Sequence, residues 1–93
     1  MLFVGLYSPK PGVSPAQTLP RRIEFKPPEG IKLVGEYWLQ NSNPRTVVAF
    51  EADNYAPIMA MNSQWADLYD ITVVPAIIGE EGLKLAQQMM PKT

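Results

Sequence analysis

The fold is decided by residues 31–52, IKLVGEYWLQNSNPRTVVAFEA, near the middle of the 93-residue chain. Residues 31–40 and 45–52 are rich in β-branched and aromatic side chains, which favour strands. Between them, Asn41-Ser42-Asn43-Pro44 is a run of turn-forming residues. Two strands joined by so short a loop pair as an antiparallel hairpin. The sequence therefore predicts a β-hairpin at the centre of the chain.

On the N-terminal side of this hairpin, the sequence predicts one strand and one helix. Residues 2–7, LFVGLY, are a strand that stops at a Pro- and Gly-rich breaker. Residues 14–17, Ser-Pro-Ala-Gln, match a helix start with a serine cap, a first-turn proline and a glutamine reaching back. Pro20 interrupts this helix, so we expect it either to kink or to begin only near Thr18.

On the C-terminal side, the pattern predicts a helix, a strand and a final helix. The first of these helices begins after Asp53 or Asn54. The strand covers residues 71–78, and Pro75 inside it cannot donate a backbone hydrogen bond, so this strand should lie at a sheet edge. Residues 79–81, Gly-Glu-Glu, open the last helix with acids at the end that the helix dipole favours.

The predicted fold class is α+β, a ferredoxin-like βαββαβ sandwich with an added C-terminal helix. Right-handed crossovers give a four-stranded antiparallel sheet in the order 4-1-3-2, with both main helices on one face. A chain of this length is expected to form one domain, residues 1–93. Without cysteine it has no disulfide, so association with another chain is the common way to bury more surface.

Alternation along the strands predicts which side chains share each face of the sheet. The face expected under the helices carries Leu2, Val4, Leu6, Leu33, Tyr37, Leu39, Val48, Phe50, Ala52, Ile71 and Val73. The other face is too apolar for water, and its predicted ligand-binding or interface residues are Phe3, Tyr7, Val34, Trp38, Val47, Thr72 and Val74. We expect a second copy of the chain to cover this face in a homodimer, rather than the chain's own C-terminal helix, which is short.

Two acids, Glu36 and Glu51, fall on this otherwise apolar face and are the candidate catalytic residues. Desolvation and mutual repulsion would raise a carboxyl pKa toward neutrality, as a general acid or base requires. Neighbouring aromatic side chains could orient a planar small molecule. The alternative is that both acids lie at the rim of the interface, solvated or paired with Lys32 or Arg45.

Charge and composition exclude several classes of function. The net charge is −1, and a carboxylate on the third strand would repel phosphate, so no nucleic-acid partner is expected. A basic patch at Arg21, Arg22 and Lys26 is the one local exception. No apolar run approaches the roughly 20 residues of a membrane span, and the start does not resemble a signal peptide, so we expect no membrane partner and a cytoplasmic location.

Histidine and cysteine are absent, which excludes their catalytic triads and argues against haem or zinc ligation. No glycine-rich phosphate loop occurs either. We therefore expect no metal site and no cofactor.

Short motifs along almost the whole chain resemble one family of small bacterial and archaeal proteins, known only as a domain of unknown function. The motifs are Met1, Phe3 and Tyr7 in the first strand, Lys10-Pro11-Gly12, Pro27-Pro28-Glu29-Gly30, Gly35-x-Tyr37, Glu51-x-Asp53, Trp65, Val74-Pro75 and Glu80-Glu81. The resemblance implies a dimeric α+β barrel in which two sheets face each other, and it implies no activity. The loop 41–44 and Pro20 depart from that pattern.

Two functions remain after these exclusions. The first is a homodimeric binding or regulatory module without catalysis. The alternative is a small cofactor-independent enzyme, isomerase- or monooxygenase-like, that uses Glu36 or Glu51 as a base in a pocket between the paired sheets.

Overall fold

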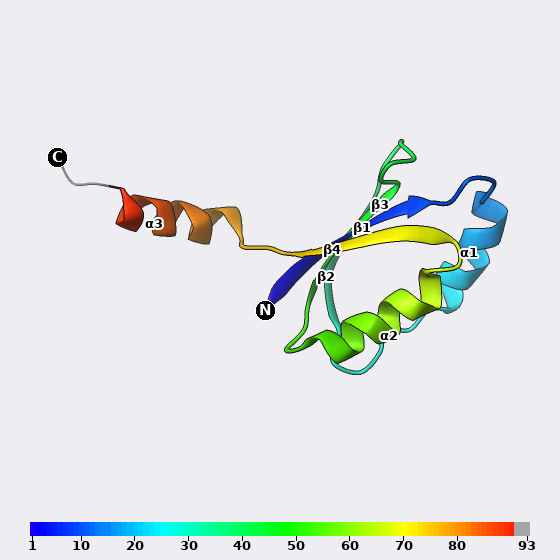
Figure 1. Cartoon of the computed structure of the whole chain (residues 1–93), viewed down its shortest axis with the longest axis horizontal. Coiled ribbons are helices and arrows are strands. Elements are labelled where there is room, and N and C mark those ends of the chain that lie inside the picture. Colours follow the sequence, from blue (N-terminus) through cyan, green and yellow to red (C-terminus); the bar gives the residue numbers. More distant parts are fainter. Residues whose placement is uncertain (91–93) are drawn as a thin grey trace.

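The computed structural model describes residues 1–90, which form seven elements around one sheet (Figure 1). In chain order these are β1 (Leu2–Pro9), α1 (Pro15–Glu24), β2 (Lys32–Trp38), β3 (Thr46–Glu51), α2 (Tyr55–Trp65), β4 (Tyr69–Pro75) and α3 (Gly79–Met89). The predicted α+β class and the βαββαβ order with a final helix are confirmed.

The four strands form one antiparallel sheet in the order β2-β3-β1-β4. These are the neighbours of the predicted order 4-1-3-2, counted from the opposite edge. Strand β4 lies at the edge, where Pro75 pairs in register with Phe3 and needs no donor on its outer side. The predicted edge position of Pro75 is therefore confirmed.

Both α1 and α2 cover the same face of the sheet (Figure 1). Helix α1 begins at Pro15, where the Ser14 backbone N–H donates to Gln17 Oε1 over 2.8 Å. The helix continues through Pro20, so the predicted later start near Thr18 is wrong. The core lies between these helices and the sheet, and its two fully buried large side chains are Phe50 and Ile58.

Strand β1 buries the face that the sequence pattern placed on the uncovered side of the sheet. Phe3 and Tyr7, expected on the uncovered face, are each 6% exposed and pack beneath the helices. The Phe3 ring stacks on Phe50 with centroids 5.8 Å apart, and the Tyr7 ring meets Tyr69 edge-on at 6.0 Å. Because LFVGLY is apolar at every position, hydrophobicity cannot choose between its faces. The aromatic contacts decide instead.

A β-bulge in β2 changes the facing of its second half. Leu33 pairs with Phe50, but the next partner, Ala49, pairs with Gly35, so Val34 is an extra residue. Beyond the bulge, alternation puts Tyr37 on the uncovered face. It puts Glu36 and Trp38 on the helix side. Strict alternation without this bulge placed Tyr37 under the helices, and that prediction is wrong.

Helix α3 extends away from the rest of the chain (Figure 1). It buries none of its residues, and the chain measures 57 × 29 × 17 Å. The radius of gyration is 15.9 Å, against about 12 Å for a compact domain of this length. Within residues 1–90, every helix is too short or too polar to cross a bilayer.

Candidate functional site

A cavity of about 700 Å³ opens on the helix side of the sheet, between α1 and the β2–β3 hairpin. Its volume lies within the range of roughly 300–1,000 Å³ typical of small-molecule sites. Aromatic and aliphatic side chains make up most of its wall. The lining residues include Tyr7, Thr18, Leu19, Arg22, Phe25, Leu33, Glu36, Trp38, Val48, Met61, Trp65 and Tyr69.

Helix α1 and the residue after it bring three of these side chains to the cavity. Thr18, Arg22 and Phe25 are spaced by four and three residues, so they follow one face of the helical turn. Thr18 is buried, whereas Leu19 and Ile23 are exposed. The inward face of α1 is therefore the one that carries Thr18 and Arg22.

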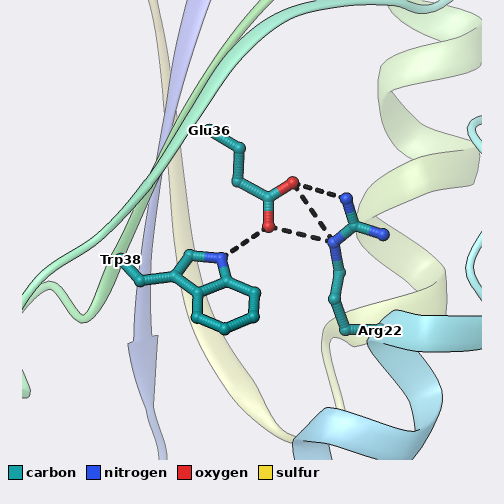
Figure 2. A network of polar contacts seen from close by, with 3 residues as sticks. All are labelled: Arg22, Glu36 and Trp38. Atoms are coloured by element: carbon teal, nitrogen blue, oxygen red, sulfur yellow. Dashed lines mark hydrogen bonds and ion pairs between the residues drawn. The ribbon is translucent and has the colours of Figure 1, made fainter.

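The polar centre of the cavity is the Glu36 carboxylate, which accepts from two side chains (Figure 2). Arg22 Nη2 donates to Glu36 Oε1 over 2.6 Å, and Arg22 Nε donates to Oε2 over 2.9 Å. Trp38 Nε1 donates to Oε2 over 2.7 Å. The Arg22 guanidinium also lies over the Phe25 ring, 5.6 Å from its centroid. This geometry is a bidentate ion pair with a third donor, which fixes all three side chains.

These contacts reverse the pKa direction expected for Glu36. The hydrogen bond from Arg22 lowers the pKa of the Glu36 carboxyl, with further lowering by Trp38 and by the Arg22 charge, and together they outweigh the desolvation that would raise it. The same pair raises the pKa of Arg22. At neutral pH Glu36 is therefore ionised, and its oxygens accept hydrogen bonds from Arg22 and Trp38. A free general base is not available at this position.

The structure does not bring the two candidate acids together. Glu51 is exposed and lies on the uncovered side of the sheet, because its neighbour Phe50 points into the core. Glu51 pairs in register with Lys32 on β2 and Leu2 on β1. The prediction that Glu36 and Glu51 share one face is wrong, since the bulge at Val34 moves Glu36 to the helix side of the sheet.

Tyr7 borders the same cavity from β1. Burial, aided by the nearby Glu36 charge, raises the pKa of Tyr7 to about 12. Its hydroxyl therefore keeps its proton at all physiological pH values. A buried phenol of this kind can donate a hydrogen bond to a ligand acceptor.

The predicted basic patch is divided between two ion pairs. Arg21 Nη1 lies 2.8 Å from Asp67 Oδ2, its second nitrogen donates to the Gln64 carbonyl, and its guanidinium lies 5.2 Å from the Trp65 ring centroid. Arg22 pairs with the acid in the cavity instead. The two arginines therefore join α1 to different parts of the fold, and they do not form one exposed cationic surface.

The remaining predicted site residues are divided between the two faces. Trp38 lines the cavity, whereas Val34, Val47, Thr72 and Val74 remain on the uncovered side. Val34 is 59% exposed there and Val74 is 41% exposed. Phe3 is part of the core and belongs to neither surface.

Sequence reasoning missed most side chains of the cavity, including four that shape its helix side. Thr18, Arg22, Phe25 and Trp65 line it, yet none was a candidate site residue. The three-and-four spacing of Thr18, Arg22 and Phe25 was the available signal. The partner of Arg22 was not readable, because it depends on the bulge in β2.

Comparison with known proteins identifies a family but no activity. Neither the curated proteins nor the solved structures contain a match to this chain. Within residues 1–90, no group of three or more acidic, histidine or cysteine side chains is arranged to hold a metal ion. The sequence does match a family over residues 1–90, and the chain accordingly belongs to DUF3303, a domain of unknown function.

Proposed function

We propose that this protein is a non-catalytic, homodimeric module that binds a small, planar and mainly apolar molecule in the cavity beneath α1. The observation that carries the proposal is an aromatic-lined cavity of about 700 Å³ whose polar side chains are held in place before any ligand enters. Sites that bind small molecules combine an apolar wall with a few fixed polar groups. The proposed place of action is the cytoplasm.

The chemistry of the wall favours an uncharged ligand. The Arg22 charge is already matched by Glu36, so an anionic ligand would have to displace a bidentate carboxylate there. Arg45, the other cation on the wall, donates to the Asn41 carbonyl. Tyr7 offers a protonated hydroxyl, and the rings of Phe25 and Trp38 offer flat apolar surface. We therefore expect a neutral aromatic ring that carries one hydrogen-bond acceptor.

The same occupied carboxylate argues against the enzymatic alternative at this site. A general base needs a free lone pair near neutral pH, and the Glu36 oxygens already accept from Arg22 and Trp38. Glu51 lies across the sheet from the cavity, so it cannot act on a molecule bound there. Binding without turnover is the function that this arrangement supports.

The homodimer is proposed to form through the uncovered face of the sheet. The middle of this face carries apolar side chains. They include Val4 and Leu6 of β1, Val47 of β3 and Val74 of β4. An antiparallel sheet exposed to water normally carries polar residues on its open face. A second copy that covers this face would also give a small domain the additional burial that it lacks.

The two parts of the proposal can be tested separately with a matched pair of variants. Val47 and Val48 are adjacent on β3 and point to opposite faces, and Val48 lines the cavity. The probe is 2-naphthol, with cyclohexanol as a non-aromatic comparison. Both tryptophans of the chain, Trp38 and Trp65, line the cavity, so their indole N–H signals in a ¹H–¹⁵N spectrum report its occupation.

We expect 2-naphthol to shift both indole signals in a saturable way, and cyclohexanol to shift them far less. Val48→Phe should reduce this response by at least tenfold while the dimer persists. Val47→Phe should leave the response intact while weakening the dimer, as measured by sedimentation. Equal effects of the two variants on 2-naphthol binding, or no saturable shift with any neutral aromatic probe, would contradict the binding proposal.

A further inference from the structure

Helix α3 is amphipathic but has nothing beneath its apolar side. One side carries the polar residues, and the other carries a continuous apolar surface. The polar side is Glu80, Glu81, Lys84, Gln87 and Gln88, and the apolar side is Gly82, Leu83, Leu85, Ala86, Met89 and Met90. Leu83 is 66% exposed and Met89 is 82% exposed. The helix therefore presents its apolar side to solvent in the isolated chain.

A helix in this position needs a partner to be stable. It has 11 residues, and isolated helices shorter than roughly 12–15 residues are marginal in water. Gly79 and Gly82 lower its intrinsic propensity further. Most helical stability in proteins comes from the packing of an apolar face, and α3 buries none of its residues within the chain.

The uncovered face of the sheet offers a matching surface, here called the apolar band. It consists of two neighbouring rows that cross all four strands in register. One row is Gly35, Ala49, Val4 and Val74, and the other is Tyr37, Val47, Leu6 and Thr72. Polar pairs bound the band at both ends, Lys32 opposite Glu51 and Ser8 opposite Asp70. Apart from Leu2, in the row of Glu51, the apolar side chains of this face lie in its middle.

We infer that α3 of a second copy lies across the apolar band, and that the two copies exchange their α3 helices in this way. The inference rests on the homodimer of the proposed function and names the element that covers each sheet. It differs from direct packing of one sheet on the other. An exchange of identical elements closes a two-fold dimer, because each copy both gives a helix and receives one.

The dimensions of the two surfaces agree. Four strands spaced about 4.8 Å apart make a sheet about 14 Å across between its outer strands, and a helix of 11 residues is about 16 Å long. The two rows of the band, with their side chains, cover a strip about as wide as one helix, roughly 10–12 Å. Ala49 forms the shallow part of this strip, because the Tyr37 side chain lies over the neighbouring Gly35.

The chain's own α3 is poorly placed to cover its own band. The Ala76 N–H still donates to the Leu2 carbonyl, so only Ile77 and Ile78 separate the sheet from α3. A reversal within two residues usually needs a left-handed conformation, which β-branched side chains strongly disfavour. Ile78 is extended instead, with φ −63° and ψ 137°, and it directs α3 outward (Figure 1).

The exposed surface is large enough for a stable dimer. Six large apolar side chains on α3 and the segment before it are each 48–82% exposed, namely Ile77, Ile78, Leu83, Leu85, Met89 and Met90. Burial of these side chains against an equal area of the band, twice in a two-fold dimer, removes roughly 900–1,800 Å² from water. This range overlaps the roughly 1,200–2,000 Å² buried in stable interfaces.

An anionic lipid surface is a less suitable occupant of α3. Interfacial helices carry basic residues on their polar side. The polar side of α3 has two acids, Glu80 and Glu81, and one base, Lys84. Its excess of negative charge would be repelled by an anionic bilayer.

The test uses the absence of cysteine from the chain, which allows single thiols to be introduced. Ala49→Cys places a thiol in the band, and Ala86→Cys places one at the centre of the apolar side of α3. The two full-length variants, one bearing an affinity tag so that their masses differ, are co-expressed and treated with a short bismaleimide. The matched control replaces Ala86→Cys with Gln88→Cys on the polar side of the same helix. Val74→Cys substitutes for Ala49→Cys if that variant does not fold.

We expect a covalent heterodimer of the Ala49→Cys and Ala86→Cys chains, formed at least tenfold faster than with the Gln88→Cys control. Cross-linking of Ala49→Cys only to itself would mean that the two sheets face each other directly, which overturns the exchange of α3 and leaves the homodimer standing. An intrachain cross-link in the Ala49→Cys/Ala86→Cys double variant would mean that α3 covers its own sheet. A monomer in sedimentation would overturn both the exchange and the proposed homodimer.

Discussion

Trp38 donates its indole N–H to the Glu36 carboxylate over 2.7 Å, from two residues further along the same strand. The two side chains can meet because alternate residues of a strand share one face. Arg22 on α1 then binds the same carboxylate from the other side of the cavity (Figure 2). One acid thus connects the sheet to α1, and its ionisation should control how firmly that helix is held.

The first prediction concerns the pH dependence of stability. Because Arg22 and Trp38 lower the pKa of Glu36 in the folded state, ionised Glu36 stabilises the fold above its ordinary pKa of 4.5. That contribution is lost as the pH falls through the lower folded-state pKa. Glu36→Gln should therefore reduce the free energy of unfolding by about 1–3 kcal/mol at pH 7. Between pH 5 and pH 3 the variant should lose less stability than the unmodified chain. Urea unfolding, followed by circular dichroism across this pH range, measures both effects.

Glu51→Gln is the control for that experiment, since Glu51 is exposed on the opposite face of the sheet. It should leave the acid limb of the stability profile close to that of the unmodified chain. A Glu36→Gln profile parallel to the unmodified one would show that the carboxylate is not held by Arg22 in solution.

The second prediction concerns Tyr7 at alkaline pH. Burial raises the pKa of Tyr7 from 10.0 to about 12, so the protonated phenol stabilises the fold fully below pH 10. This contribution, of order 2–3 kcal/mol, is lost as the pH rises from 10 toward 12. Absorbance at 295 nm should show a tyrosine that ionises near pH 12. The late step should disappear in Tyr7→Phe and persist in Tyr37→Phe, because Tyr37 is exposed on the other face.

The third prediction concerns the close approach of Gly5 to Tyr7. A Cβ atom at Gly5 would lie 2.8 Å from Cε1 of the buried Tyr7 ring, which is closer than real contacts allow. Gly5→Ala should therefore push this ring into the cavity and destabilise the fold by about 1–3 kcal/mol. Gly79→Ala is the control, because nothing lies within 4 Å of the new methyl group. Thermal unfolding of the two variants gives the comparison, and equal melting temperatures would contradict the packing described for β1.

The fourth prediction concerns the contact of Arg21 with α2. Its guanidinium lies over the Trp65 ring and donates to the Gln64 carbonyl at the end of that helix. Arg21→Met should destabilise the fold by about 0.5–1 kcal/mol through loss of the cation–π contact. A double-mutant cycle with Trp65→Leu, which removes the aromatic ring, isolates this interaction in urea unfolding experiments. Additive effects of the two substitutions would mean that the ring and the guanidinium do not interact.

Several elements were predictable because their causes are local. The hairpin at residues 31–52 follows from β-forming runs on either side of a short turn. The edge position of β4 follows from the one missing donor of Pro75. The start of α1 follows from the capping of Ser14 by Gln17, although Pro20 suggested a later start than Pro15.

The candidate site was predictable only in part. Tyr7, Glu36 and Trp38 were expected close together, and they do line one cavity. In the alternative with both acids at the rim of the interface, Glu36 would be solvated or paired with Lys32 or Arg45, whereas its partner is Arg22. No local pattern identifies that pairing, because it depends on the bulge in β2 and on the packing of α1 against the sheet.

The sequence by itself determined the order of the elements, the antiparallel neighbours and the presence of a surplus apolar face, because these depend on propensity, turn residues and hydrophobic pattern along the chain. Only the tertiary structure decided which face of β1 is buried and where β2 carries its bulge. The reason is that β1 is apolar on both faces, and the one extra residue at Val34 reverses the alternation that follows it. The bulge puts Glu36 beneath α1 and leaves Glu51 on the other side of the sheet, and the facing of β1 brings Tyr7 to the same cavity.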